Sequence, residues 1–308
     1  MAMKILFITS TYLGDAIISS GILNENIKKY PKAKFTVVSG NAPAPLFKNF
    51  PQVEKVIPLA KKKFSMHWID LWFRCFLTKW DIIIDVRGTG ISYFLYTKKR
   101  YIWQSKNTQK MKVHQLAEWM GLKATPENKI WVGKEDLSKA KELIGTSKVI
   151  CISPAANWDK KCWPLNYFSE LCADLTSKKG LFPGYKIAVF GAPNQRQELQ
   201  PLFDQLPEAE DFVGRITLPT IAAYFSLSEL FIGNDSGLMH LAASMETKTL
   251  GLFGPSPENI YGPWGKNAIF VRTPEDFFES MDKARNGLEV MKSLKVSAVK
   301  KAIEKLIS

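Results

Sequence analysis

Short apolar runs alternate along this chain with longer segments in which apolar residues recur every three or four positions. The short runs are typical of buried strands in a parallel sheet, and the longer segments are typical of amphipathic helices. In the first half the pattern predicts strands at residues 4–9, 34–38, 53–57 and 81–85 and helices at 16–30, 64–79 and 113–120. In the second half it predicts strands at residues 149–153, 186–190, 229–232 and 248–253 and helices at 165–178, 218–225, 237–245 and 296–307.

A chain that alternates strands with helices forms parallel sheets covered by helices. The alternation restarts once, near residues 145–148, and 308 residues suit two domains of roughly 150 residues each. We therefore predict an α/β protein with two doubly wound domains facing a central cleft, residues 1–145 and 146–308. Ligands of such sheets bind beyond the carboxyl ends of the strands. We leave open that the terminal helix packs back on the N-terminal domain.

The net charge of +13 is confined to the first half. Residues 1–145 hold 24 Lys and Arg against 11 Asp and Glu, whereas residues 146–308 hold 18 of each sign. Such asymmetry indicates that one half faces an anionic partner, which can be nucleic acid, a membrane surface or an acidic substrate. The alternative is a solvated basic face with no specific partner.

The composition, with 46% hydrophobic and 23% charged residues, excludes a disordered or fibrous chain. No apolar run approaches the ~20 residues that span a bilayer, and the N-terminal segment does not resemble a signal peptide. The four cysteines form no Cys-x-x-Cys pair and have no histidine partners at metal spacing. We therefore expect reduced thiols in a cytoplasmic protein.

Gly14 and Asp15 follow the first predicted strand. Glycine permits a tight turn with close approach of a ligand, and a carboxylate beyond a strand end can act as a general base toward a hydroxyl. The alternative is that Asp15 caps the following helix, since Asp is a favoured N-cap residue.

A second motif, Gly233-Asn234-Asp235-Ser236-Gly237, lies directly between a predicted strand and a predicted helix. The helix N-terminus offers unpaired N–H groups that suit a phosphate, and His240 follows one helical turn later. Asp235 would repel a phosphate and is better suited to a helix cap or a sugar hydroxyl. Taken alone, the motif is also compatible with an ordinary capped turn.

Two further loops follow predicted strands. Lys161, two residues before Trp163, can neutralise a departing phosphate, or it can be an ordinary solvated lysine. Gly254 and Pro255 form a rigid wall that suits a nucleotide pocket and any tight loop equally. The aromatic segment at residues 64–80, preceded by Lys61, Lys62 and Lys63, is compatible with a membrane-facing helix and with a core-facing one.

These motifs together resemble glycosyltransferase family 9, the lipopolysaccharide heptosyltransferases. The resemblance rests on ordered segments that cover most of the chain: residues 4–17, 81–88, 152–164, 190–192, 214–223, 233–243, 252–257 and 262–265. Its most specific part is Asp235-Ser236-Gly237-Leu238-Met239-His240 followed by Phe253-Gly254-Pro255. The resemblance implies a GT-B architecture with an N-terminal acceptor domain and a C-terminal nucleotide-sugar domain.

The resemblance also implies roles for individual residues. Asp15 is the expected base, and Lys161 is expected near the donor phosphates. The expected donor-binding residues are Asp235, Ser236, Gly237, His240, Gly254, Pro255 and, on the ribose, Asp211. The expected acceptor-side residues are Thr9, Gly14, Lys61, Lys62, Lys63 and Arg87, of which Thr9 and Arg87 depart from the residues that the family often carries. No metal or other cofactor is expected.

The sequence thus predicts an inverting, metal-independent enzyme that moves heptose from ADP-heptose to the inner core of lipopolysaccharide. The expected partners are the nucleotide sugar, an anionic glycolipid and the cytoplasmic face of the inner membrane, which the protein would contact peripherally as a monomer. One alternative is a transferase of the same fold with another nucleotide sugar or acceptor. A second is a non-catalytic binding protein. A nucleic-acid binder is disfavoured because no recognition motif is present.

Overall fold

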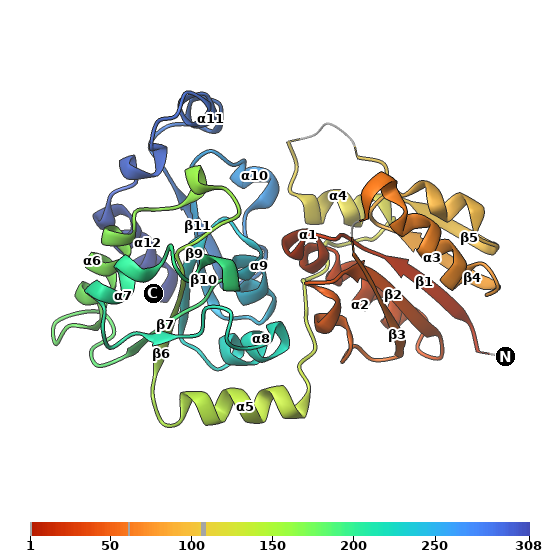
Figure 1. Cartoon of the computed structure of the whole chain (residues 1–308), viewed down its shortest axis with the longest axis horizontal. Helices are drawn as coiled ribbons and strands as arrows, with labels where there is room; N and C mark the ends of the chain where they lie inside the picture. Colours follow the sequence, from red (N-terminus) through yellow and green to blue (C-terminus); the bar gives the residue numbers. More distant parts are fainter. Residues whose placement is uncertain (1, 61, 106–108) are drawn as a thin grey trace. The chain divides into compact units, whose positions relative to one another are not determined.

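The computed structural model describes residues 2–60, 62–105 and 109–308. The chain divides into two compact units, Met1–Gly133 and Lys134–Ser308, each built around one sheet (Figure 1). The excess charge follows this division, because residues 1–133 carry 21 Lys and Arg against 8 Asp and Glu. The predicted α/β class with two parallel sheets is confirmed.

The first unit has a five-stranded sheet in the order β3-β2-β1-β4-β5 in which every pair is parallel. The strands are β1 (Lys4–Ile8), β2 (Lys34–Gly40), β3 (Val53–Leu59), β4 (Trp80–Asp85) and β5 (Thr97–Ile102). Residues 5–8 of β1 are fully buried because helices cover both faces of the sheet. The strand order reverses between β1 and β4, so their carboxyl ends form the topological switch point of this unit.

Two of the three helices predicted in the first unit differ from the structure, which divides one of them and shortens another. They are α1 (Leu13–Ile18), α2 (Ser20–Lys29), α3 (His67–Cys75) and α4 (Lys112–Trp119), with 3-10 turns η1 (Ala44–Phe47), η2 (Lys63–Ser65) and η3 (Gly90–Phe94). The helix predicted at residues 16–30 begins at Leu13 and is interrupted at Ser19. The Ser19 hydroxyl donates to the Ala16 carbonyl at 2.8 Å and shares a hydrogen bond with the Thr9 hydroxyl, which accounts for the break.

The second unit has a six-stranded parallel sheet in the order β11-β10-β9-β6-β7-β8. Its strands are β6 (Val149–Ser153), β7 (Lys186–Val189), β8 (Glu210–Asp211), β9 (Leu230–Asn234), β10 (Lys248–Phe253) and β11 (Ala268–Arg272). This is the classical dinucleotide-binding order, with its switch point between β6 and β9. The two edge strands were not predicted, because β8 has two residues and β11 is only half buried.

Helices cover this second sheet as well. They are α5 (Lys134–Ile144), α6 (Leu165–Thr176), α7 (Gln200–Gln205), α8 (Leu218–Ser226), α9 (Gly237–Ser244), α10 (Glu258–Tyr261), α11 (Phe277–Arg285) and α12 (Val296–Ile307). The 3-10 turns are η4 (Asp159–Lys161), η5 (Pro193–Gln195) and η6 (Val290–Ser293). No helix among the described residues is both long and apolar enough to cross a bilayer.

Two details differ from the predicted domain organisation. Helix α5 packs on α8, where the Thr220 hydroxyl donates to Asp136 at 2.8 Å, so the division precedes α5 instead of following residue 145. The terminal helix α12 buries Val299 and Ile303 in the core of the second unit, against α6, β10 and β11. Its apolar face is therefore occupied by its own unit.

Candidate functional site

An ion pair joins two of the predicted site residues at the switch point of the second unit. Strands β6 and β9 are neighbours, with Ser153 opposite Gly233, so the loops that follow them meet. The Lys161 ammonium, in η4, lies 2.6 Å from the Asp235 carboxylate. Their side chains are 22% and 9% exposed, respectively. The structure thus brings together a cation and an anion that lie 74 positions apart in the sequence.

Asn234 and Trp163 hold the loop that carries Lys161. The Asn234 side chain is fully buried, donates to the Pro154 carbonyl at 2.5 Å and accepts from the Trp163 amide at 3.0 Å. The Trp163 indole is also fully buried and donates to the Leu294 carbonyl at 2.8 Å. Both ends of the β6–α6 loop are therefore fixed. Asn234 lies inside the Gly233–Gly237 motif, but its bracing role was not predicted because its partners are distant in sequence.

The N-terminus of α9 lies beside this ion pair. Ser236 is the N-cap residue and Gly237 the first helical residue, while His240 follows one turn later and is buried. The Ser236 hydroxyl oxygen is buried without a hydrogen-bond partner among the described residues, and it does not cap the helix. A buried hydroxyl next to unpaired helix N–H groups suits an anionic or hydroxylated ligand.

A second unsatisfied hydroxyl lies on the neighbouring loop. Leu252 of β10 is opposite Asn234 of β9, which places the loop after β10 next to the start of α9. In this loop the Ser256 side chain is 2% exposed, and its hydroxyl oxygen has no hydrogen-bond partner within the described ranges. The sequence analysis named Gly254 and Pro255 in this loop and missed Ser256. The sequence marks Ser256 as a site residue only by its place in the same motif.

The wall formed by Gly254 and Pro255 is held from behind by Arg272. The Arg272 guanidinium donates to the Gly254 carbonyl at 3.1 Å and forms an ion pair with Glu258. A β-carbon on Gly254 would lie 2.5 Å from the Met291 sulfur, so a larger residue here would require the Met291 side chain to move. Packing within the unit therefore favours Gly254, whereas Pro255 is a buried part of the wall.

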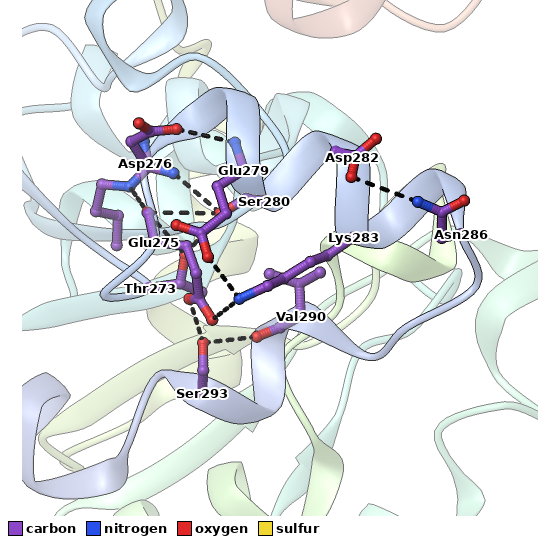
Figure 2. Close-up of polar contacts among 11 residues, drawn as sticks. Thr273, Glu275, Asp276, Glu279, Ser280, Asp282, Lys283, Asn286, Val290 and Ser293 are labelled. Carbon is purple, nitrogen blue, oxygen red and sulfur yellow. Dashed lines mark hydrogen bonds and ion pairs between the residues drawn. The ribbon is translucent and has the colours of Figure 1, made fainter.

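The polar network behind this wall extends to α11, as Figure 2 shows. Glu275 accepts from the Ser293 hydroxyl at 2.7 Å and from the Lys283 ammonium at 3.2 Å. Burial acts to raise the pKa of Glu275, but these hydrogen bonds outweigh it, and the pKa falls below its ordinary value. Lys160 reaches the same region, donating to the Gly287 carbonyl at 3.0 Å. The loops around Lys161 are thus tied to α11 and η6.

Asp211 is not brought together with the Lys161–Asp235 pair. It ends β8, which is separated from β6 by β7. Its carboxylate lies 2.6 Å from Arg196 and 2.7 Å from Arg215 and also accepts from the Val213 amide. Both guanidinium groups contact Oδ2 and the Val213 amide donates to Oδ1, so both oxygens that were expected to meet a ribose are engaged.

In the first unit Asp15 lies in the first turn of α1. Tyr12 is the N-cap residue, so Asp15 does not cap the helix, and the capping interpretation is wrong. Within the described part of the chain no hydrogen bond or ion pair engages its carboxylate, and the residue is half-buried, as is Gly14. An unengaged carboxylate at a switch-point loop is available to a ligand.

Arg87 lies in the adjacent loop of the first unit, because Ile8 and Asp85 are opposite each other at the ends of β1 and β4. The Arg87 guanidinium donates to the Thr11 hydroxyl at 2.7 Å and lies 5.3 Å from the Trp68 ring centre. Asp85 stabilises this loop by accepting five hydrogen bonds from residues 87, 88, 89 and 92. Burial raises the pKa of Asp85, and the hydrogen bonds oppose that effect.

The other residues that were predicted on the acceptor side differ in where they lie. Thr9 is 2% exposed and bonded to Ser19 at 2.6 Å, so it supports the α1–α2 break and does not face a ligand. Lys62, paired with Asp70, and Lys63 are exposed and follow the carboxyl end of β3, an edge strand that β2 separates from the β1–β4 switch point. Lys61 lies outside the described residues.

Lys112 is a candidate that the sequence analysis missed. It begins α4, and its ammonium lies 4.5 Å from the Trp103 ring centre. Burial lowers the pKa of Lys112, and the negative charge of Asp15 acts in the opposite direction, so the two groups are near each other. No run of apolar or catalytic residues marks this lysine in the sequence. Across residues 2–60, 62–105 and 109–308, no cluster of three or more metal-ligating side chains occurs.

Replacing Asn234 by alanine is expected to lower the free energy of unfolding by about 2–4 kcal/mol, because a buried N–H and a buried carbonyl lose their partners. Urea denaturation of the full chain measures this. The exposed Asn286, whose side chain donates to the Asp282 carboxylate at 3.4 Å, provides the matched control. The Asn286→Ala change should stay within about 0.5 kcal/mol. Equal losses in both variants would contradict the bracing role of Asn234.

Comparison with known proteins agrees with this geometry. The model of glycosyltransferase family 9 (heptosyltransferase) matches residues 87–286. The chain is 28% identical over 287 residues to lipooligosaccharide heptosyltransferase 2 of Campylobacter jejuni, covering 87% of this chain and 86% of that protein.

Solved structures share the fold across the whole chain. The glycosyl transferase family 9 structure from Veillonella parvula is 22% identical, with a TM-score of 0.81 and coverage of 99% of this chain and 97% of that chain. E. coli ADP-heptose lps heptosyltransferase II is 18% identical, with a TM-score of 0.76 and coverage of 99% and 98%. The two Rossmann-like units are those of the GT-B architecture. The family match spans most of the chain, and we conclude that this protein belongs to glycosyltransferase family 9, the heptosyltransferase family.

Proposed function

We propose that this enzyme transfers heptose from ADP-heptose to the inner core of lipopolysaccharide with inversion at the anomeric carbon. The observation that carries the proposal is the Lys161–Asp235 ion pair beside the N-terminus of α9, at the switch point of a family 9 chain. The similar E. coli structure is described as an ADP-heptose heptosyltransferase, which supports the choice of donor.

The second unit is the proposed donor unit. The helix N–H groups at Gly237 and the ammonium of Lys161 would bind the diphosphate and stabilise the charge that it gains on leaving. The free hydroxyls of Ser236 and Ser256 would satisfy polar atoms of the nucleotide sugar. Asp235 would keep Lys161 in place and accept from a sugar hydroxyl. His240, one turn along α9, would complete this wall, together with Pro255.

The first unit is the proposed acceptor unit. The Asp15 carboxylate would take the proton from the acceptor hydroxyl as its oxygen attacks the anomeric carbon. The bond from that carbon to the diphosphate oxygen breaks, ADP leaves, and the configuration inverts in this single displacement. Arg87 and Lys112, two cations near the same switch point, would hold phosphate or carboxylate groups of the acceptor.

The charge of the first unit supports peripheral contact with the membrane. An acceptor anchored in the cytoplasmic face of the inner membrane presents a negative surface, and a unit with 21 cations against 8 anions is attracted to it. We propose that the protein acts there as a monomer. Attachment of this kind weakens as salt rises.

Transfer is expected to proceed without a divalent metal. Incubation with ADP-heptose and a heptose-free Kdo-lipid A acceptor in excess EDTA should give the same initial rate as incubation with Mg²⁺, because Lys161 and the α9 terminus supply the positive charge. Mass spectrometry of the product measures the transfer. A panel of UDP-, GDP- and ADP-sugars serves as the control for donor identity.

Three results would contradict parts of this proposal. Loss of activity in EDTA, restored by added metal, would overturn the metal-free step. Transfer from a different nucleotide sugar would keep the enzyme class and replace the donor. Binding of ADP-heptose with no transfer to any inner-core acceptor would favour a non-catalytic binding protein.

A further inference from the structure

The first unit carries an exposed apolar face formed by α3, η3 and the residues that flank them. Nine of the sixteen exposed large hydrophobic residues described in the chain lie between residues 64 and 96. They are Phe64, Met66, Ile69, Phe73, Phe76, Leu77, Tyr93, Phe94 and Tyr96. We call this set the α3–η3 face. Phe64 is 95% exposed and Leu77 is 83% exposed. Exposing a contiguous apolar surface to water costs free energy, so a surface of this kind marks an interaction site.

This face is not simply the back of a core helix. Leu71 and Cys75 of α3 are fully buried in the cluster that also contains Leu6 and Ile83 of the sheet. Ile69 and Phe73 lie on the other side of α3 and are 47% and 63% exposed. The aromatic segment at residues 64–80 is therefore both a core element and an exposed apolar surface, and the two sequence interpretations each describe one side of it.

Contacts between α3 and η3 fix the arrangement of the α3–η3 face, and a pocket lies in it. The Trp72 indole donates to the Phe94 carbonyl at 3.0 Å, which joins α3 to η3, and the Trp72 and Phe76 rings stack with centres 4.5 Å apart. Between the two elements lies an apolar pocket of about 330 Å³, lined by Trp68, Ile69, Trp72, Ile91 and Phe94. These contacts hold apolar side chains toward solvent in a defined arrangement.

Positive charge surrounds the face. Residues 62–100 contain eight Lys and Arg and three Asp. Two of the three acids, Asp70 and Asp81, are paired with Lys62 and Lys98, and the third, Asp85, is buried beneath η3. Among the exposed cations are Lys63, Arg74, Lys79 and Arg100. An apolar surface inside a ring of lysine and arginine complements a bilayer with anionic headgroups.

The face adjoins the proposed acceptor site. Trp68, in the wall of the pocket, lies under the guanidinium of Arg87, and Arg87 reaches Thr11 at the end of β1. A sugar at the switch point would thus lie next to a lipid surface on the α3–η3 face. We infer that the α3–η3 face inserts into the interface of an anionic lipid bilayer and keeps the first unit on the membrane that holds the acceptor. The inference rests on the proposed use of a lipid-anchored acceptor.

Vesicle co-sedimentation of the full chain tests this inference without any donor. We expect binding to vesicles of phosphatidylcholine with phosphatidylglycerol, and much weaker binding to phosphatidylcholine alone. The F73S/L77S variant should bind the anionic vesicles at least about tenfold more weakly, because it removes two inserted side chains. The K63E/K79E variant should also bind more weakly and respond less to added salt.

A matched variant in the second unit is the control. F278S/L288S replaces two residues that are 70% and 56% exposed and lie outside the face, and it should bind vesicles as the unchanged protein does. The urea midpoint of each variant checks that it is folded. The F73S/L77S variant should also keep its transfer rate toward an acceptor dispersed in detergent. That measurement separates a failure of docking from a failure of the proposed transferase activity.

Three outcomes would overturn the inference. The first is no vesicle binding by the unchanged protein. The second is equal binding by F73S/L77S and the unchanged protein. The third is a concentration-dependent dimer that F73S/L77S abolishes in solution while vesicle binding is unaffected, which would make the α3–η3 face an interface between copies of this chain.

Discussion

Lys161→Ala is expected to lower kcat for heptosyl transfer by about 10²–10³-fold, because the departing diphosphate loses a preorganised cation in a partly buried site. The ammonium lies 2.6 Å from Asp235 and its side chain is 22% exposed, so it is held at one position before the donor binds. The KM for the donor should rise much less than kcat falls, since the charge of the diphosphate is greatest in the transition state. Steady-state kinetics with varied ADP-heptose measure both.

The adjacent Lys160 is the matched control for this change. It has the same chemistry, one position away, but it donates to the Gly287 carbonyl and has no carboxylate partner among the described residues. Lys160→Ala should change kcat by no more than about threefold. If both variants keep the full rate, Lys161 has no part in the chemistry and the ion pair with Asp235 is purely structural.

Loss of Lys161 also leaves the Asp235 carboxylate buried and unpaired. We expect Lys161→Ala to lower the free energy of unfolding by roughly 2–3 kcal/mol. This loss is smaller than is usual when one partner of a buried ion pair is removed, because Lys161 keeps some contact with water. The double variant K161M/D235N removes both charges and should recover part of this stability without recovering activity. Recovery of activity in the double variant would contradict a catalytic role for the ammonium.

Asp15→Asn is expected to lower kcat by about 10²–10⁴-fold, the usual contribution of a positioned general base. The amide keeps the size of the side chain and cannot accept the proton of the acceptor hydroxyl. Stability should change by no more than about 1 kcal/mol, because the variant loses a favourable charge in the first turn of α1 and its attraction to the nearby Lys112. Transfer to the Kdo-lipid A acceptor and a urea unfolding curve measure the two effects.

Asp70→Asn provides the control in the same unit. Asp70 is also in the first turn of a helix, α3, but its carboxylate is already paired with Lys62. This variant should keep its rate toward an acceptor in detergent. A fully active Asp15→Asn enzyme would remove Asp15 from the chemistry, and its lack of a capping contact would then leave it without an assigned role.

The elements that the sequence predicted well are the ones buried on both faces. Apolar runs such as residues 4–8 and 149–153 are strands because parallel strands between two helical layers exclude polar side chains. The prediction failed at two places for different reasons. Edge strand β11 has no fully buried residue, and the helix expected at residues 16–30 breaks at Ser19 because a side-chain hydrogen bond competes with the helix.

The site was predicted unevenly for a related reason. Asp235, Ser236 and Lys161 follow strands, and strand ends are where parallel sheets bind ligands, so local sequence was enough to nominate them. Thr9 also follows a strand, but its hydroxyl turns inward to Ser19. Asp211 is the last residue of a strand, but its carboxylate forms ion pairs with Arg196 and Arg215. The direction and partners of a side chain depend on neighbours that are remote in sequence.

The sequence by itself determined the family, the two parallel sheets, the confinement of the charge to the first half and the loops that we propose carry the chemistry. These follow from residue order and periodicity, which are local properties. Only the tertiary structure decided that Lys161 meets Asp235, that Asn234 braces their loop and that Arg87 reaches Thr11. It also decided that one side of α3 is core while the other is exposed. Each of these depends on which strands become neighbours, and strand order is set by the packing of the whole sheet.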